Sequence, residues 1–226
     1  MTTADEDYTL VFNGEIYNYA EIKKELIKLG CKFETKNSDT EVLLLGYKKF
    51  GFKIFNKLRG MFAGCIYDSH KNQCILFRDS VGIKPLYYFK DSGQLFFSSE
   101  LKPLIKYIKS PVFNTNELQH YFTNRCTSLN STFIKGAKKV LPGTFVTINC
   151  DSLEYVTKKY KLQKQSKSNL TYKEKLKKLD KLLEASVANH MISDVPVGVF
   201  LSGGVDSSVI SYYSTKLKKI NCLFDH

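Results

Sequence analysis

The clearest structural signal in the chain is Pro196-Val-Gly-Val-Phe-Leu-Ser-Gly-Gly-Val-Asp-Ser-Ser208. Its apolar first half predicts a buried strand, and the Ser-Gly-Gly in its middle predicts a tight turn into a helix. Glycines let backbone N–H groups approach an anion closely, and the first turn of a helix favours negative charge. The stretch therefore predicts a phosphate-binding loop at the start of a nucleotide-binding unit.

The acidic residue of this loop, Asp206, defines its chemistry. The phosphate loop G-x-x-x-x-G-K-[ST] places a lysine near a transferring γ-phosphate, whereas this loop has no lysine. A carboxylate beside a polyphosphate needs a hard cation between the two, so the pattern indicates Mg²⁺ and an ATP that loses pyrophosphate, as in adenylation. The residues predicted to bind ATP are Leu201, Ser202, Gly203, Gly204, Val205, Asp206, Ser207 and Ser208, with Asp206 as the metal ligand.

A second cluster, Val11-Phe-Asn-Gly-Glu-Ile-Tyr-Asn18, lies near the other end of the chain. Residues 8–12 have the composition of a short strand, which we expect to stop at Asn13-Gly14. Asn18, with Glu21 three residues later, predicts a capped helix over residues 18–29. By itself Asn-Gly is only a turn signal.

Taken together, the two clusters resemble one enzyme family. NGEIYN followed by Asn37-Ser-Asp-Thr-Glu41 resembles the glutamine-binding region of class II glutamine amidotransferase domains. SGGVDSS resembles the pyrophosphate loop of the ATP-dependent synthetase domain joined to them. The pair is similar to glutamine-hydrolysing asparagine synthetases, and further landmarks follow in order: Leu58-Arg-Gly-Met-Phe-Ala63, Arg78-Asp-Ser-Val-Gly-Ile-Lys-Pro-Leu-Tyr-Tyr88, Ser98-Ser-Glu-Leu-Lys102, Leu141-Pro-Gly143 and His190-Met-Ile-Ser-Asp-Val-Pro196.

The resemblance implies roles for four residues of the N-terminal part. The Asn13 side-chain amide and the Gly14 N–H would stabilise an oxyanion during amide hydrolysis. Glu15 and Asp39 would bind the α-ammonium of glutamine. The implied reaction is a carbon–nitrogen ligation in which glutamine-derived ammonia and ATP-activated aspartate give asparagine, AMP and pyrophosphate. Glutamine, aspartate and ATP are then the expected partners, and the intact protein is expected to be a homodimer.

Two departures from the family pattern bear on activity. Family members carry a nucleophilic cysteine directly after the initiator methionine, whereas this sequence begins Met1-Thr-Thr, and Cys31 has no α-amine beside it. Thr2 is an alternative nucleophile if Met1 is removed. We expect a fragment truncated at both ends, beginning after the nucleophile, ending at His226 within the second domain, and inactive as given. The alternatives are a non-catalytic remnant or partner subunit that at most binds glutamine, and a related amidotransferase acting on another carboxylate.

The remaining pattern predicts two domains. Helix signals cover residues 18–29 and 38–50, strand signals cover 61–67, 73–78, 86–89, 95–98, 144–149 and 154–160, and a helix from Thr171 places Leu176, Leu179, Leu183 and Val187 on one face. We expect an α+β domain over residues 1–160, an incomplete αββα sandwich of the N-terminal-nucleophile type. A polar linker over 161–170 then precedes residues 171–226, the first α/β unit of a doubly wound nucleotide-binding domain.

Composition excludes several function classes. The 226 residues are 43% hydrophobic, and no apolar run approaches the roughly twenty residues of a membrane span. The net charge of +12 comes mostly from lysines spread along helices, which predicts a solvated surface and no nucleic-acid partner. The six cysteines and four histidines show no metal-ligand spacing, so we expect Cys65 and Cys74 to be small core residues of a cytoplasmic protein without zinc.

Overall fold

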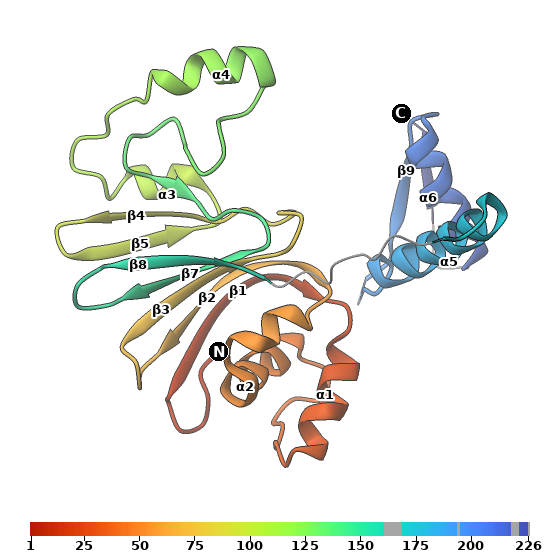
Figure 1. Ribbon diagram of the computed structural model, residues 1–226, viewed down its shortest axis with the longest axis horizontal. Helices are drawn as coiled ribbons and strands as arrows, with labels where there is room; N and C mark the ends of the chain where they lie inside the picture. The colour runs from red at the N-terminus through yellow and green to blue at the C-terminus, as the bar shows by residue number, and fades with distance from the viewer. Residues whose placement is uncertain (161–168, 194, 218–221, 226) are drawn as a thin grey trace. The chain divides into compact units, whose positions relative to one another are not determined.

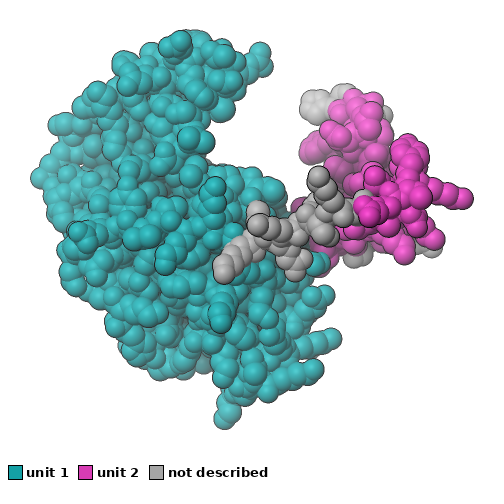
Figure 2. Space-filling view, in the orientation of Figure 1, with its two compact units in different colours: residues 1–162 teal, residues 163–226 magenta. Residues whose placement is uncertain are grey.

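Figure 1 shows the computed structural model, which describes residues 1–160, 169–193, 195–217 and the backbone of 222–225. The chain divides into two compact units, Met1–Leu162 and Gln163–His226 (Figure 2). The division falls inside the predicted linker, of which residues 161–168 lie outside the described residues. None of the described helices is long and apolar enough to cross a membrane.

The first unit contains two antiparallel sheets. The larger has the order β1-β2-β3-β7-β8, with β1 Tyr8–Ile16, β2 Gly60–Asp68, β3 Gln73–Arg78, β7 Thr144–Asn149 and β8 Tyr155–Lys159. The smaller has the order β5-β4-β6, with β4 Tyr87–Asp91, β5 Gln94–Ser98 and β6 Lys138–Lys139. The helical segments are α1 Tyr19–Lys28, α2 Asp39–Phe50, the 3₁₀ segment η1 Gly51–Asn56, α3 Leu101–Ile105 and α4 Asn116–Asn124.

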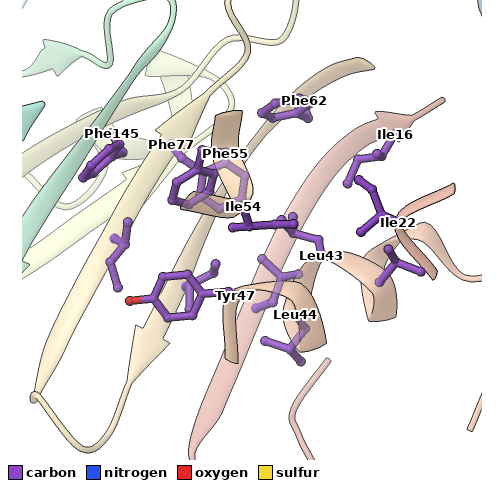
Figure 3. Close-up of a cluster of buried hydrophobic side chains, with 14 of the residues drawn as sticks. Ile16, Ile22, Leu43, Leu44, Tyr47, Ile54, Phe55, Phe62, Phe77 and Phe145 are labelled. Carbon is purple, nitrogen blue, oxygen red and sulfur yellow. The ribbon is translucent and has the colours of Figure 1, made fainter. Parts of the chain in front are cut away.

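Side-chain alternation along β2 explains the layers. Phe62 and Ile66 point to one face and join the buried cluster shared with α1 and α2. Figure 3 labels Phe62 among the side chains of this cluster. Ala63 and Cys65 point to the other face and join a cluster with Tyr88 of the second sheet. A third cluster joins the second sheet to α3. The order helix, sheet, sheet, helix confirms the predicted α+β sandwich.

The prediction that the first strand stops at Asn13-Gly14 is wrong. β1 continues to Ile16 because β2 pairs with all nine of its residues, from Tyr8↔Asp68 to Ile16↔Gly60. Gly14 has a φ of 144°, and a Cβ there would overlap the Met61 carbonyl oxygen. Gly14 therefore allows β1 and β2 to approach closely, and it does not form a turn.

The predicted capping role of Asn18 is also wrong, although α1 does begin at the next residue. The Asn18 side chain makes no cap hydrogen bond. Its Nδ2 donates to the Lys57 carbonyl oxygen at 2.8 Å, and its Oδ1 accepts from the Arg59 N–H at 2.8 Å. The amide thus fixes the segment that leads into β2. Ser38, in contrast, caps α2 by accepting from the Glu41 N–H at 3.2 Å.

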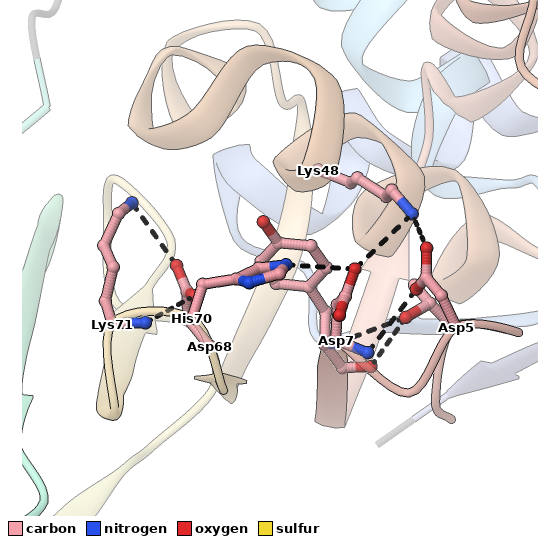
Figure 4. A network of polar contacts seen from close by, with 8 residues as sticks. Asp5, Asp7, Lys48, Asp68, His70 and Lys71 are labelled. Carbon is pink, nitrogen blue, oxygen red and sulfur yellow. Dashed lines mark hydrogen bonds and ion pairs between the residues drawn. The ribbon is translucent and has the colours of Figure 1, made fainter.

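Polar contacts tie the first residues of the chain to the β2–β3 turn and to α2 (Figure 4). His70 Nε2 lies 3.0 Å from an Asp7 carboxylate oxygen, and Lys48 forms an ion pair with Asp5. Lys71 Nζ lies 3.3 Å from the carboxylate of Asp68, which is buried. This cluster lies at the beginning of β1, away from Asn13.

The second unit contains α5 Tyr172–His190, β9 Gly198–Leu201, α6 Val205–Lys216 and β10 Cys222–Asp225. β9 and β10 pair in parallel, as expected for a strand–helix–strand unit of a nucleotide-binding domain. Thr171 and Glu174 form a capping box at the start of α5. Of the face predicted for this helix, Val187 is buried, whereas Leu176 and Leu179 are exposed.

Candidate functional site

The residues predicted to form an oxyanion site lie at the end of β1. Leu10, Phe12 and Ile16 face the helices, so Asn13 and Glu15 face the opposite side. Asn13 Nδ2 donates to Ser99 Oγ at 3.1 Å across 86 residues of sequence. Ser99 directly follows β5, so this hydrogen bond joins the end of β1 to the second sheet.

Asp39 is the first residue of α2 and reaches the same strand end. Its Oδ2 accepts the Ile16 backbone N–H at 2.9 Å, and its Oδ1 lies 3.3 Å from the donor Thr40 Oγ1. An acidic residue is favoured in the first turn of a helix by the positive end of the helix dipole. The structure therefore joins Asp39 to Ile16, the last residue of β1, which directly follows the predicted residues Asn13, Gly14 and Glu15 in the same strand.

A buried carboxylate behind this strand end was not predicted. Asp79 is fully buried, and its two oxygens accept five backbone N–H groups, from Phe62, Val81, Gly82, Ile83 and Lys84. The Asp79 N–H also donates to the Phe62 carbonyl oxygen at 2.7 Å, and Phe62 is the cross-strand partner of Gly14. Asp79 thus supports the β2 segment opposite Gly14.

Arg78 completes the support of the loop between β3 and β4. Its guanidinium donates to the carbonyl oxygens of Gly82, Lys84 and Val140 at 2.7, 2.6 and 2.9 Å. Burial lowers the pKa of the Arg78 side chain. Residues 78–88 were a family landmark without an assigned role, and the structure gives Arg78 and Asp79 a positioning role.

Thr2 lies far from the predicted oxyanion site. It forms an isolated bridge with Thr9, and the two hydroxyl oxygens are 3.2 Å apart. Thr9 precedes Asn13 by four residues, which is about 14 Å along a strand. A nucleophile must lie within about 3.5 Å of the bond it attacks. This position argues against the alternative that Thr2 serves as the nucleophile.

The loop after β9 has the predicted strand–turn–helix form, but the prediction that the strand is buried is wrong: of its residues only Val199 is buried, and Phe200 is 68% exposed. Leu201 ends the strand, Gly204 is the N-cap of α6, and Gly203 has a φ of 73° with no atom within 4 Å of where a Cβ would lie. Ser202, Gly203, Gly204, Val205 and Asp206 are all exposed. An anion can therefore approach the backbone of this turn without meeting a side chain.

Three serines hold the turn in shape. Ser207 Oγ donates to the Gly204 carbonyl oxygen at 3.0 Å and lies 3.1 Å from Ser202 Oγ. Ser208 Oγ donates to the same carbonyl oxygen at 2.8 Å. Asp206 stands in the first turn of α6. The donor set of exposed backbone, hydroxyls and one carboxylate fits a phosphate chain with a hard cation.

Comparisons with known proteins agree with both halves of the sequence. A family model described as glutamine amidotransferase domain matches residues 1–161, and one described as asparagine synthase matches residues 178–222. Glutamine-hydrolysing asparagine synthetase 1 of Bacillus subtilis (strain 168) is 43% identical over 93% of this chain and 33% of its own length. Asparagine synthetase B of Escherichia coli (strain K12) is 34% identical over 92% of this chain and 32% of its own length. The chain thus spans about a third of the length of these relatives.

Proposed function

The chain belongs to the glutamine amidotransferase domain family, and on that premise we propose that it is part of a glutamine-hydrolysing asparagine synthetase. In this proposal, residues 1–160 bind glutamine and the loop from Leu201 to Ser208 binds ATP. The main support is the hydrogen bond from the Ile16 N–H to Asp39 Oδ2, which fixes Asp39 at the end of the strand that contains Asn13 and Gly14.

At the glutamine end, each residue suits one part of the substrate. Attack on the side-chain amide of glutamine develops negative charge on its oxygen, and the Asn13 amide and the Gly14 N–H would stabilise that charge. An asparagine amide has two N–H donors, so one can hold Ser99 Oγ while the second serves the oxyanion. The carboxylates of Glu15 and Asp39 suit the α-ammonium of glutamine.

At the ATP end, the backbone of Ser202, Gly203 and Gly204 and the first turn of α6 would hold the phosphates. Asp206 would hold the Mg²⁺ ion, which neutralises phosphate charge when bound. Ser207 and Ser208 keep the turn in the shape that this requires. The substrate to be activated is aspartate by family similarity.

Product analysis tests the proposal on the complete natural polypeptide that contains this sequence. With glutamine, aspartate, ATP and Mg²⁺, we expect asparagine, glutamate, AMP and pyrophosphate in equal amounts. ADP and phosphate as products would contradict the assigned loop chemistry. Glutamate and AMP formed only with a carboxylate other than aspartate would leave the two sites in place and overturn the assignment of the acceptor.

A further inference from the structure

Three cysteines form a diagonal row on one face of the larger sheet. Cys65 lies on β2, Cys74 lies on β3, and Cys150 directly follows β7. The register pairs Cys74 with Tyr67 on one side and with Ile148 on the other. Cys65 and Cys150 are each two residues from those partners, so all three side chains point to the same face. That face is the one covered by the second sheet.

Two of these sulfur atoms are in contact, since Cys74 Sγ lies 3.8 Å from Cys150 Sγ. The Cys65 thiol acts on Cys74 as a hydrogen-bond donor. Cys65 is 4% exposed, whereas Cys74 and Cys150 are only partly buried. Cys74 and Cys150 are therefore the more accessible pair, and Cys65 is buried.

The three thiols differ in acidity. The hydrogen bond from Cys65 lowers the pKa of Cys74 to about 7. Burial and the neighbouring Cys74 raise the pKa of Cys150 to about 11. Near pH 7 about half of Cys74 is therefore thiolate, whereas Cys65 and Cys150 stay protonated, and the thiolate is the reactive form of cysteine.

We propose that Cys74 and Cys150 are a peroxide-sensitive dithiol pair that closes into a disulfide. The Cys74 thiolate attacks one oxygen of hydrogen peroxide, the O–O bond breaks, and hydroxide leaves, which gives a sulfenic acid at Cys74. The Cys150 sulfur then attacks the Cys74 sulfur, the S–O bond breaks, and the oxygen leaves as water with the thiol proton of Cys150. In sum, two thiols and one peroxide give one disulfide and two waters.

The backbone around Cys150 permits this closure. A disulfide requires an S–S length of about 2.05 Å, so the two sulfur atoms must approach by about 1.8 Å. Cys150 lies in the turn after β7, where its N–H donates to the Asn72 carbonyl oxygen at 2.9 Å. Because Cys74 and Cys150 are diagonal neighbours, side-chain rotation and a small shift of the turn that carries Cys150 together supply the movement. Among the described residues, no group of three or more histidine, cysteine or acidic side chains is placed to hold a metal ion.

Peptide mapping under non-reducing conditions tests the pair on the full chain at pH 7. With one equivalent of hydrogen peroxide, the wild type should lose two thiols and yield a peptide that links Cys74 to Cys150. Cys150→Ser should give no such link and should keep Cys74 as a sulfenic acid that dimedone labels. The matched control is Cys126→Ser, which removes an exposed cysteine and should behave as the wild type.

A second measurement separates reactivity from folding. The alkylation rate of Cys74 should rise with a midpoint near pH 7, and Cys65→Ala, which removes the hydrogen-bond donor, should slow it at pH 7 by roughly fifteenfold if the thiol pKa returns to about 8.5. Retention of both thiols under peroxide would overturn the proposal. So would a link from Cys65 to Cys74, or a Cys74 that is oxidised no faster than Cys126.

Discussion

At the residue scale, Gly14 shows how one position depends on a distant strand. Asn13-Gly14 was expected to be a turn because this dipeptide favours turns in isolation. The structure keeps it in β1, since β2, more than forty residues later, pairs with it and approaches too closely for a Cβ. The local sequence shows the glycine, but the contact with Met61 that requires it forms only in the folded chain.

Gly14→Ala should destabilise the chain by about 2 kcal/mol more than Gly136→Ala. Both glycines have a positive φ, but only Gly14 has backbone atoms where the new methyl group would lie, and Gly136 has no atom within 4 Å. Urea unfolding of both variants measures the difference in free energy of unfolding. Equal losses would show that the close approach of β1 and β2 is absent in solution.

Buried Glu41 contributes to the pH dependence of stability. Burial alone would raise its pKa, but hydrogen bonds from the Thr35 hydroxyl and from the N–H groups of Glu34 and Thr35 outweigh burial and lower the pKa below 4.5. A carboxyl group whose pKa falls on folding contributes stability above its unfolded pKa and loses it as pH falls through the folded value.

Glu41→Gln should therefore reduce stability at pH 7, and the difference from the wild type should shrink as pH falls below about 4.5. Urea unfolding from pH 7 to pH 3 measures this difference. Glu154→Gln, at an exposed position, is the matched control and should show a much smaller change. A Glu41→Gln deficit that grows towards acid would contradict the hydrogen-bonded carboxylate.

At the element scale, local signals predicted the ends of most helices and strands. The start of α2 was found because the Ser38 cap bonds to a residue only three positions later. The capping prediction for Asn18 failed because its hydrogen-bond partners, Lys57 and Arg59, lie about forty residues away in sequence. A helix cap was predicted correctly where its hydrogen bond is local, and it was misjudged where a distant segment binds the same side chain.

The loop between β3 and β4 depends on Asp79, and Asp79→Asn should cost about 3 kcal/mol. An amide keeps one acceptor oxygen but turns an NH₂ group towards backbone N–H donors, which then lose their partner. Thermal or urea unfolding gives the cost. Asp91→Asn, at the partly exposed end of β4, is the control and should change stability by less than about 0.5 kcal/mol. A similar small change at Asp79 would exclude its role as the anchor of the loop.

At the scale of the whole molecule, the stability of the first unit comes from its own residues. The three buried apolar clusters draw their members from residues 8–160. We expect residues 1–162, produced alone, to unfold cooperatively with a midpoint within a few degrees of the corresponding transition of the full chain. A broad, non-cooperative transition would show that the first unit needs the second.

The candidate sites could be predicted in part because their motifs are continuous in sequence. NGEIYN and SGGVDSS each place their residues within a few positions, and the family resemblance added Asp39. The sequence did not indicate Ser99 or Asp79 as supports, since their contacts to Asn13 and Phe62 join segments 86 and 17 residues apart. These supporting contacts exist only in the folded chain.

We propose that the Asn13 site releases ammonia from glutamine and that the site of the ATP loop uses it. A comparison of Asn13→Ala with Asp206→Asn in the complete natural polypeptide tests this most directly. We predict that Asn13→Ala loses 10²–10³-fold in glutamine-dependent asparagine formation but keeps wild-type synthesis from added ammonium, because only the oxyanion site is altered. Asp206→Asn should abolish synthesis from both nitrogen sources and keep glutamine hydrolysis. If Asn13→Ala impairs both nitrogen sources equally, or if Asp206→Asn makes asparagine at the wild-type rate, the assignment of the two sites is wrong.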